Sequence, residues 1–183
     1  MTDTKQDTWE DRVPRQIGWG LLPKGSVLYD SDIYGGTSSD EFTKRIVGKR
    51  NLFFFNFDQK GNVFGAYIKS MITGTDVWIE DSNHFIISID STEPITSQKH
   101  WFPKGRNAKH ALMVYKNDPN KLYTVGGFGY GYFTICKTNV CLSHCVNLSW
   151  EYKNMEDTDL NGTNHPQYFL TKRILVIENI ELK

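Results

Sequence analysis

The stretch "NLFFFNFDQKGNVFGAYIK" (51–69) contains two apolar runs on either side of a short polar break. The break, "DQKGN", consists of five residues that are typical of turns, and one of them is Gly61. Two strand-like runs joined by a short turn of this kind predict a β-hairpin. The first run, "LFFFNF", is apolar almost throughout, which indicates a strand covered on both faces. The hairpin therefore predicts a β-rich fold.

Strand patterns recur on both sides of this hairpin. A short strand and a turn are expected at 26–32, and further strands at 84–90, 110–116, 121–127, 131–138 and 173–182. Ser38 followed by Glu41 is a capping-box pattern, and Gly48 suits a helix end, so 38–47 is predicted to be a helix. We expect seven or eight strands in all. The predicted fold class is mainly β (α+β), a sandwich of two antiparallel β-sheets with one or two short helices.

The chain has 183 residues, which is enough for one domain with its own core. We divide it into an N-terminal arm at 1–20, which carries Trp9 and Trp19, and a single domain at 21–183. The formal net charge is zero, which excludes a basic field over the whole molecule. The polar N-terminus contains no targeting signal, and the three cysteines are an odd number. These features predict a cytoplasmic protein that is not inserted in a membrane, with the nucleus as the alternative location.

Four glycines alternate with aromatic residues in "TVGGFGYGYFTICKT" (124–138). A dinucleotide loop needs a third glycine at the position of Tyr132 and a helix after it. The residues that follow predict a strand instead. We therefore interpret the glycines as part of a sheet, at places where the backbone packs closely.

The residue types suggest two kinds of metal site. Cys136, Cys141, His144 and Cys145 are of the residue types that hold zinc, although their spacing fits no strong zinc pattern. The same cysteines could instead be peroxide-reactive or simply buried. The segments 30–35 and 157–162 begin like calcium loops, but each lacks some of the required ligands. We predict no metal and no cofactor.

The segment "KHWFPKGRNAKH" (99–110) interleaves basic and aromatic residues and is expected to be an exposed loop. This composition is typical of single-stranded nucleic-acid platforms, of surfaces for acidic protein partners, and of solvated loops anchored by their aromatics. The predicted partner-binding residues are Lys99, Trp101, Lys104, Arg106 and Lys109.

No known catalytic motif occurs in the chain, and its five histidines have no evident nucleophile partner. The residues alone therefore predict a cytosolic β-rich domain that binds a partner and is not an enzyme.

Five segments of the chain occur in a recognisable order. They are "LYDSDIYGGTSSDEF" (28–42), "LFFFNFDQKGNVFGAYI" (52–68), "EDSNHFIISID" (80–90), "GGFGYGYFTI" (126–135) and "ILVIENIEL" (174–182). In order and spacing they resemble the TLDc domain, the C-terminal module of the oxidation-resistance proteins. The resemblance implies a β-sandwich and a protective role in oxidative stress. It also implies binding to the vacuolar proton-pumping ATPase, which several members of that family regulate.

Three functions follow as hypotheses. The first is a non-enzymatic interaction module of the oxidative-stress response that binds and regulates the proton-pumping ATPase. The second is a stress-linked regulatory protein that binds DNA or RNA through the loop at 99–110. The third is a thiol-based peroxide sensor that uses Cys136, Cys141 or Cys145.

Overall fold

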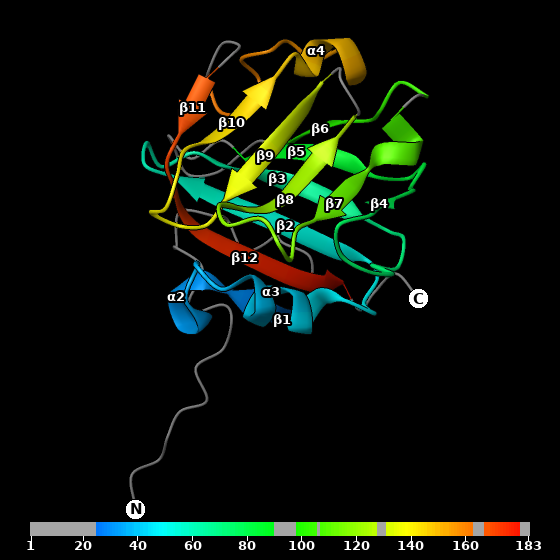
Figure 1. Cartoon of the computed structure of the whole chain (residues 1–183). Helices are drawn as coiled ribbons and strands as arrows, with labels where there is room; N and C mark the ends of the chain where they lie inside the picture. The colour runs from blue at the N-terminus through cyan, green and yellow to red at the C-terminus, as the bar shows by residue number, and fades with distance from the viewer. Residues whose placement is uncertain (1–24, 90–97, 106, 128–130, 163–166, 180–183) are drawn as a thin grey trace, which may run out of the picture.

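Two antiparallel sheets packed face to face form the body of the molecule in a computed structural model of the chain (Figure 1). The structure describes residues 25–89, 98–105, 107–127, 131–162 and 167–179. Within these ranges the predicted fold class, a sandwich of two antiparallel β-sheets with short helices, is confirmed. The predicted arm at 1–20, with Trp9 and Trp19, lies outside the described residues.

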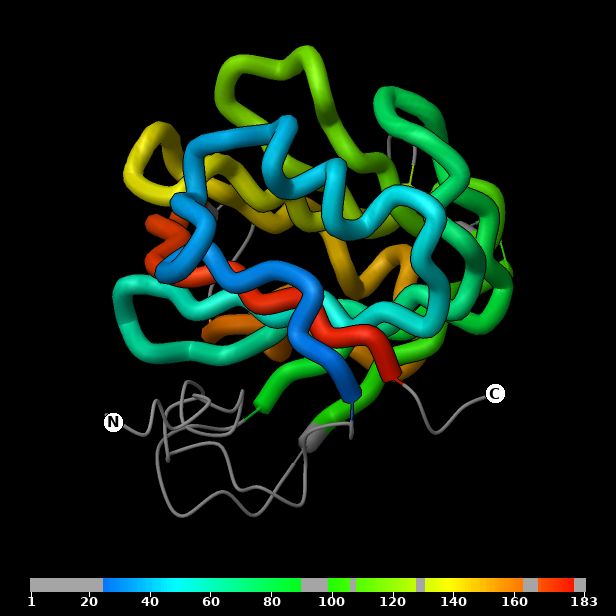
Figure 2. Tube along the Cα trace, turned by 90° about the horizontal axis from the view of Figure 1, so that it is seen from below, coloured from blue at the N-terminus to red at the C-terminus, as the bar shows by residue number. Residues whose placement is uncertain are grey.

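Each sheet has six described strands. In sheet A the order is β1 (Gly25–Asp30), β12 (Thr171–Asn179), β2 (Leu52–Asp58), β3 (Val63–Ile68), β5 (Phe85–Ile89) and β6 (Gln98–Trp101). In sheet B it is β11 (Gln167–Phe169), β10 (Ser143–Val146), β9 (Tyr132–Cys136), β8 (Lys121–Gly126), β7 (Leu112–Val114) and β4 (Trp78–Ile79). The two ends of the described chain meet in sheet A, where β1 lies beside β12 (Figure 2).

The predicted hairpin is β2 and β3, with Asp58 closing its turn. The Asp58 carboxylate accepts hydrogen bonds from the backbone N–H groups of Lys60 and Asn62, at 2.8 and 3.0 Å. All seven residues of β2 are buried, which confirms a strand covered on both faces. The hairpin register pairs Phe54 with Ala66 and Phe55 with Gly65.

The predicted helix at 38–47 is α3 (Ser39–Ile46), and the Ser38 hydroxyl caps it by accepting from the Glu41 N–H at 3.1 Å. Phe42 projects from this helix into the end of the sandwich, where its ring lies 4.9 Å from Tyr29 and 5.8 Å from Tyr123. The helix therefore closes the edge of the core beside β1 (Figure 1).

The number of strands was underestimated, because twelve are present in the described residues instead of seven or eight. The missed strands β4, β6, β10 and β11 have two to four residues each, too few to show a period of two. Helices were also missed. The turn expected at 30–32 is the start of α2 (Ser31–Tyr34), a second short helix is α4 (Leu148–Glu151), and η2 (Asn107–His110) is a 3-10 turn.

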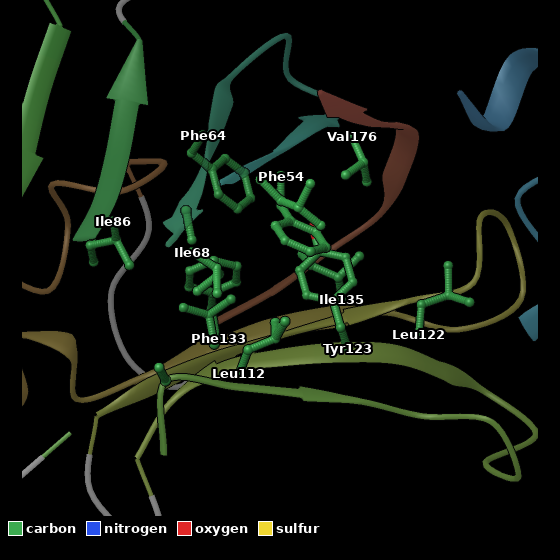
Figure 3. Packing of buried hydrophobic residues seen from close by; sticks show 14 of the residues in the cluster. Phe54, Phe64, Ile68, Ile86, Leu112, Leu122, Tyr123, Phe133, Ile135 and Val176 are labelled. Atoms are coloured by element: carbon green, nitrogen blue, oxygen red, sulfur yellow. The ribbon is translucent and has the colours of Figure 1, made fainter. Parts of the chain in front are cut away.

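The core lies between the sheets. Phe54 and Phe64 point from sheet A toward Tyr123 and Phe133 of sheet B (Figure 3). The ring centroids of Phe54 and Tyr123 are 5.1 Å apart, and those of Phe64 and Phe133 are 6.0 Å apart. Alternation along β2 then turns Phe55 and its neighbours to the other face of sheet A, where they form a second apolar cluster.

Candidate interaction surface

Trp101 was predicted to be an exposed partner-binding residue, and this prediction is wrong. The segment 98–101 is not a loop but the edge strand β6, which pairs with β5 and sets Trp101 opposite Ile86. Opposite residues of paired strands share a face, and Ile86 faces the core. Trp101 is accordingly only 5% exposed and belongs to the core cluster.

After β6 the chain forms a short ribbon with the residues that end and follow α4. We call the segments 102–104 and 151–153 the β6–α4 ribbon. The Lys104 N–H donates to the Glu151 carbonyl at 2.6 Å, and the Lys153 N–H donates to the Phe102 carbonyl at 2.9 Å. Pro103 and Tyr152 form an antiparallel bridge between these two bonds. Because the backbone is paired on both sides, the ribbon presents its side chains from a fixed framework.

Tyr152 anchors the ribbon to the core, because its side chain is fully buried there. The hydroxyl of Tyr152 lies 3.3 Å from Nε2 of the buried His84, and Nδ1 of His84 lies 2.7 Å from the carbonyl oxygen of Asp81. A carbonyl can only accept, so Nδ1 carries the proton and Nε2 accepts from Tyr152. Burial lowers the pKa of His84, which keeps the ring in this neutral form.

Two aromatic side chains are exposed on or next to the ribbon. Phe102 is 54% exposed, and Trp150, on α4, is 61% exposed. Three lysines accompany them: Lys99 on β6, and Lys104 and Lys153 on the ribbon, all of them exposed. The Lys104 ammonium donates to the Ser149 carbonyl at 2.8 Å, which ties the ribbon to α4. The surface combines apolar rings with positive charge.

Of the five predicted residues, the structure places Lys104 on the ribbon and Lys99 on the adjoining strand β6. Lys99 lies 3.9 Å from Asp159, an exposed and therefore weak ion pair. Lys109 is exposed on η2, which packs against β4 and β8. Arg106 lies outside the described residues. Trp150 was missed because "NLSWEY" has neither the period of a strand nor the length of a recognisable helix.

The glycines of 124–138 that are described serve the sheet, as predicted. Gly126 ends β8 at φ +87°, and a Cβ there would lie 2.7 Å from the Gly131 carbonyl oxygen. At Gly131, a Cβ would lie 2.3 Å from the Asn147 carbonyl oxygen. The strand β9 follows, not a helix, so this segment lacks the helix N-terminus of a phosphate loop.

Cys136, Cys141, His144 and Cys145 do not form a zinc site in the structure. His144 and Cys145 are consecutive residues of β10, so their side chains point to opposite faces of sheet B. Cys145 is buried in the core, whereas His144 packs against Tyr132 and Tyr168. The four side chains therefore cannot converge on one ion.

The thiols considered for peroxide sensing differ in their surroundings. Cys136 and Cys145 are buried, whereas Cys141 is half-buried. Burial, together with the neighbouring Cys141, raises the pKa of Cys136 to about 12. The thiolate of Cys136 is therefore scarce near neutral pH.

The two Asp-rich segments use their carboxylates within the protein. Asp30 is buried and accepts from the Arg173 guanidinium at 3.1 and 2.7 Å. Asp157 accepts from the Ser149 N–H at 2.9 Å, and Asp159 accepts from the Glu156 N–H at 2.8 Å. Across the part of the chain that the structure describes, no three His, Cys, Asp or Glu side chains are grouped so that they could hold a metal.

Comparison with known proteins does not assign this chain to a family. No protein-family model matches the chain, and no curated protein matches it significantly. Among the described residues, none of the helices is long and apolar enough to span a bilayer.

Proposed function

We propose that this chain is a non-enzymatic interaction module of the oxidative-stress response, which captures an acidic protein partner through the β6–α4 ribbon. The observation that carries the proposal is the exposure of Trp150, at 61%, beside the lysines of a backbone-paired ribbon. Tryptophan is enriched among the residues that dominate binding energy at protein interfaces. The resemblance to the TLDc domain supports the oxidative-stress setting and suggests the vacuolar proton-pumping ATPase as the partner.

Charge and shape together favour a protein as the partner. The ammonium groups of Lys99, Lys104 and Lys153 would steer an acidic surface toward the ribbon. The Phe102 ring packs against the Phe85 ring, with 5.5 Å between centroids. This contact orders Phe102 before binding, so filling a pocket on the partner costs less side-chain entropy. The zero net charge of the chain weighs against nucleic acid, whose binding depends on neutralising many phosphates.

The test is affinity capture with the full-length chain, with and without nuclease and at two salt concentrations, read by mass spectrometry. We expect the wild type to recover subunits of the proton-pumping ATPase in a manner that nuclease does not change. The variant Trp150→Ala with Lys104→Glu should lose most of this recovery. Adding Arg106→Glu tests whether the predicted residue outside the described ranges also contributes.

A matched control is Ile33→Ala with Lys172→Glu. Ile33, on α2, is 45% exposed, and Lys172 on β12 is also exposed, so the control removes similar groups elsewhere. Melting temperatures of both variants should stay at the wild-type value. If the ribbon variant and the control recover equal amounts of partner, the ribbon does not take part in the interaction. Recovery that disappears with nuclease or moderate salt would favour the nucleic-acid function instead.

A further inference from the structure

A hollow of about 270 Å³ lies on the outer face of sheet B. Thr124 of β8 and Thr134 of β9 line it, whereas their neighbours Tyr123, Val125 and Phe133 belong to the core. Alternation along the strands therefore places the hollow on the face that points away from sheet A. In Figure 1 this is the face formed by β4 and β7 to β11.

The floor of the hollow is a chain of hydroxyl groups. Thr124 and Thr134 are directly opposite in the register, and their oxygens are 2.8 Å apart. The Tyr115 hydroxyl lies 3.1 Å from the Thr124 oxygen. Three hydroxyls carry three hydrogens, and the two contacts among them use two. One hydrogen and several lone pairs are left for atoms outside this chain of hydroxyls.

The walls of the hollow are aromatic. Trp78 on β4 lies at one side, and Tyr132 on β9 lies at the other, beside His144 with 5.8 Å between ring centroids. All three rings are half-buried, so part of each remains accessible to a ligand. Beyond His144, at 5.8 Å, the Tyr168 ring is 61% exposed and extends the aromatic row.

The hollow is close to neutral. Its one lysine, Lys121, lies 3.6 Å from the Asp118 carboxylate and 5.4 Å from the centroid of the Tyr115 ring. Burial, with Lys121 as a lesser cause, lowers the pKa of His144, so its imidazole is uncharged at neutral pH. A site for phosphate would present unpaired cations or several N–H donors instead.

Threonine hydroxyls and a neutral imidazole share one property, which is that each can both donate and accept a hydrogen bond. Alcohols have the same property, whereas a phosphate mainly accepts. A sugar ring also has an apolar C–H face that packs against an aromatic ring. By contrast, the outer face of sheet A carries a large apolar cluster that includes Phe55 and Leu175.

We propose that the hollow on the outer face of sheet B binds a neutral saccharide. The rings of Trp78 and Tyr132 pack against its C–H faces. The Tyr115 hydroxyl and His144, both on half-buried side chains, hydrogen-bond its hydroxyl groups, and the buried Thr124 and Thr134 hold the Tyr115 hydroxyl in place. The volume is below that of sites for drug-sized ligands, which fits a single sugar unit. This site goes beyond the proposed protein interaction and shares no residue with the ribbon.

The test is saturation-transfer NMR on the full-length chain with methyl β-D-glucoside, methyl β-D-galactoside, methyl α-D-mannoside and N-acetylglucosamine, each at millimolar concentration. Inorganic phosphate and AMP serve as comparison probes. We expect transfer to at least one sugar and a shift of the Trp78 indole signal. Thr124→Val removes one hydroxyl at nearly constant shape and should weaken the affinity about tenfold, the equivalent of one lost hydrogen bond.

Two further variants keep the test decisive. Trp78 lies on the short edge strand β4, so Trp78→Ala should fold and should abolish the sugar signal. The control Thr73→Val changes an exposed threonine elsewhere and should leave the affinity unchanged. Transfer that is equal in wild type and Trp78→Ala would overturn the proposal, as would a lack of response to every sugar. A response to AMP or phosphate alone would overturn it in favour of an anion site.

Discussion

Asn56 is a fully buried amide in the middle of β2, among phenylalanines. Its Oδ1 accepts a hydrogen bond from the Tyr123 hydroxyl of sheet B, and its Nδ2 donates to the Phe64 carbonyl at 3.3 Å. Burial raises the pKa of Tyr123, so the phenol stays protonated and remains a donor. This is a polar link between the two sheets inside the core.

Replacing Tyr123 by Phe should therefore cost more than the lost bond alone. The change leaves the Asn56 oxygen buried without its donor, a penalty of about 1–3 kcal/mol in the free energy of unfolding. Urea denaturation of the wild type and of Tyr123→Phe measures this cost. In an Asn56→Leu background the same change should cost clearly less, because no acceptor is then stranded. Equal costs in both backgrounds would mean that the two groups do not act as a unit.

Trp101 marks the limit of prediction from the sequence at this scale. A basic and aromatic segment looks the same whether its tryptophan is a hot spot or a core residue. Only the pairing of β6 with β5, which sets Trp101 opposite Ile86, decides the matter. The short run "QKHW" carries no signal of that pairing. Lys104 is exposed, as predicted, because the charge of a lysine keeps it at the surface whichever element carries it.

At the scale of elements, most of the strands that were predicted are long ones, and β7, with three residues, is an exception. The hairpin β2–β3 and the strands β5, β8, β9 and β12 have five or more residues, so their apolar patterns are visible. The helix α3 was also predicted, because its cap chemistry is local. Short edge strands such as β4 form only because a neighbour offers unpaired backbone groups. The hollow on sheet B was missed because it requires β4, β8, β9 and β10 in one register.

Gly61 and Gly126 both have positive φ, and they differ in the space that a Cβ would have. Gly61, in the β2–β3 turn, has φ +85° and open space where a Cβ would be. Gly126, at the end of β8, has φ +87°, but a Cβ there would lie 2.7 Å from the Gly131 carbonyl oxygen. We expect Gly61→Ala to cost about 1–2 kcal/mol, the cost of a left-handed backbone in a residue with a Cβ. Gly126→Ala should cost more than Gly61→Ala.

Thermal and urea unfolding of both variants measure this difference. The comparison emphasises the steric clash, because the two positions have nearly the same φ. If Gly126→Ala were as mild as Gly61→Ala, the end of β8 would have to relax, and the glycines of 124–138 would have another purpose than close packing.

At the scale of the whole molecule, the two proposed sites occupy separate places. The β6–α4 ribbon extends from the edge strand of sheet A, whereas the hollow lies on the outer face of sheet B. The order of the strands could not be predicted from the sequence. β12 is inserted between β1 and β2, so the last described strand completes the sheet that the first one begins. Such long-range pairing has no local signal in the chain.

One buried histidine connects the stability of this molecule with pH. His84 is fully buried, and both of its ring nitrogens are engaged, Nδ1 with Asp81 and Nε2 with Tyr152. Burial lowers its pKa below the usual value near 6.5. At a pH below about 6.5 the unfolded chain takes up a proton at this position and the folded chain does not. Stability is therefore fully present above that pH and falls as the pH decreases further.

We expect the free energy of unfolding to be constant from pH 8 to 7 and to fall below about pH 6.5, by at most about 1.4 kcal/mol per pH unit from this group. Urea denaturation at several pH values measures the slope.

The variant His84→Asn keeps a donor near the Asp81 carbonyl but cannot titrate. It should be less stable than the wild type at pH 7.5, because it leaves the Tyr152 hydroxyl without its acceptor. Its stability should nevertheless decline less between pH 6.5 and 5.5. Parallel curves for the two proteins would show that protonation of His84 does not couple to unfolding, and the loss of stability in acid would then have to arise at other groups, such as His144, whose pKa burial also lowers.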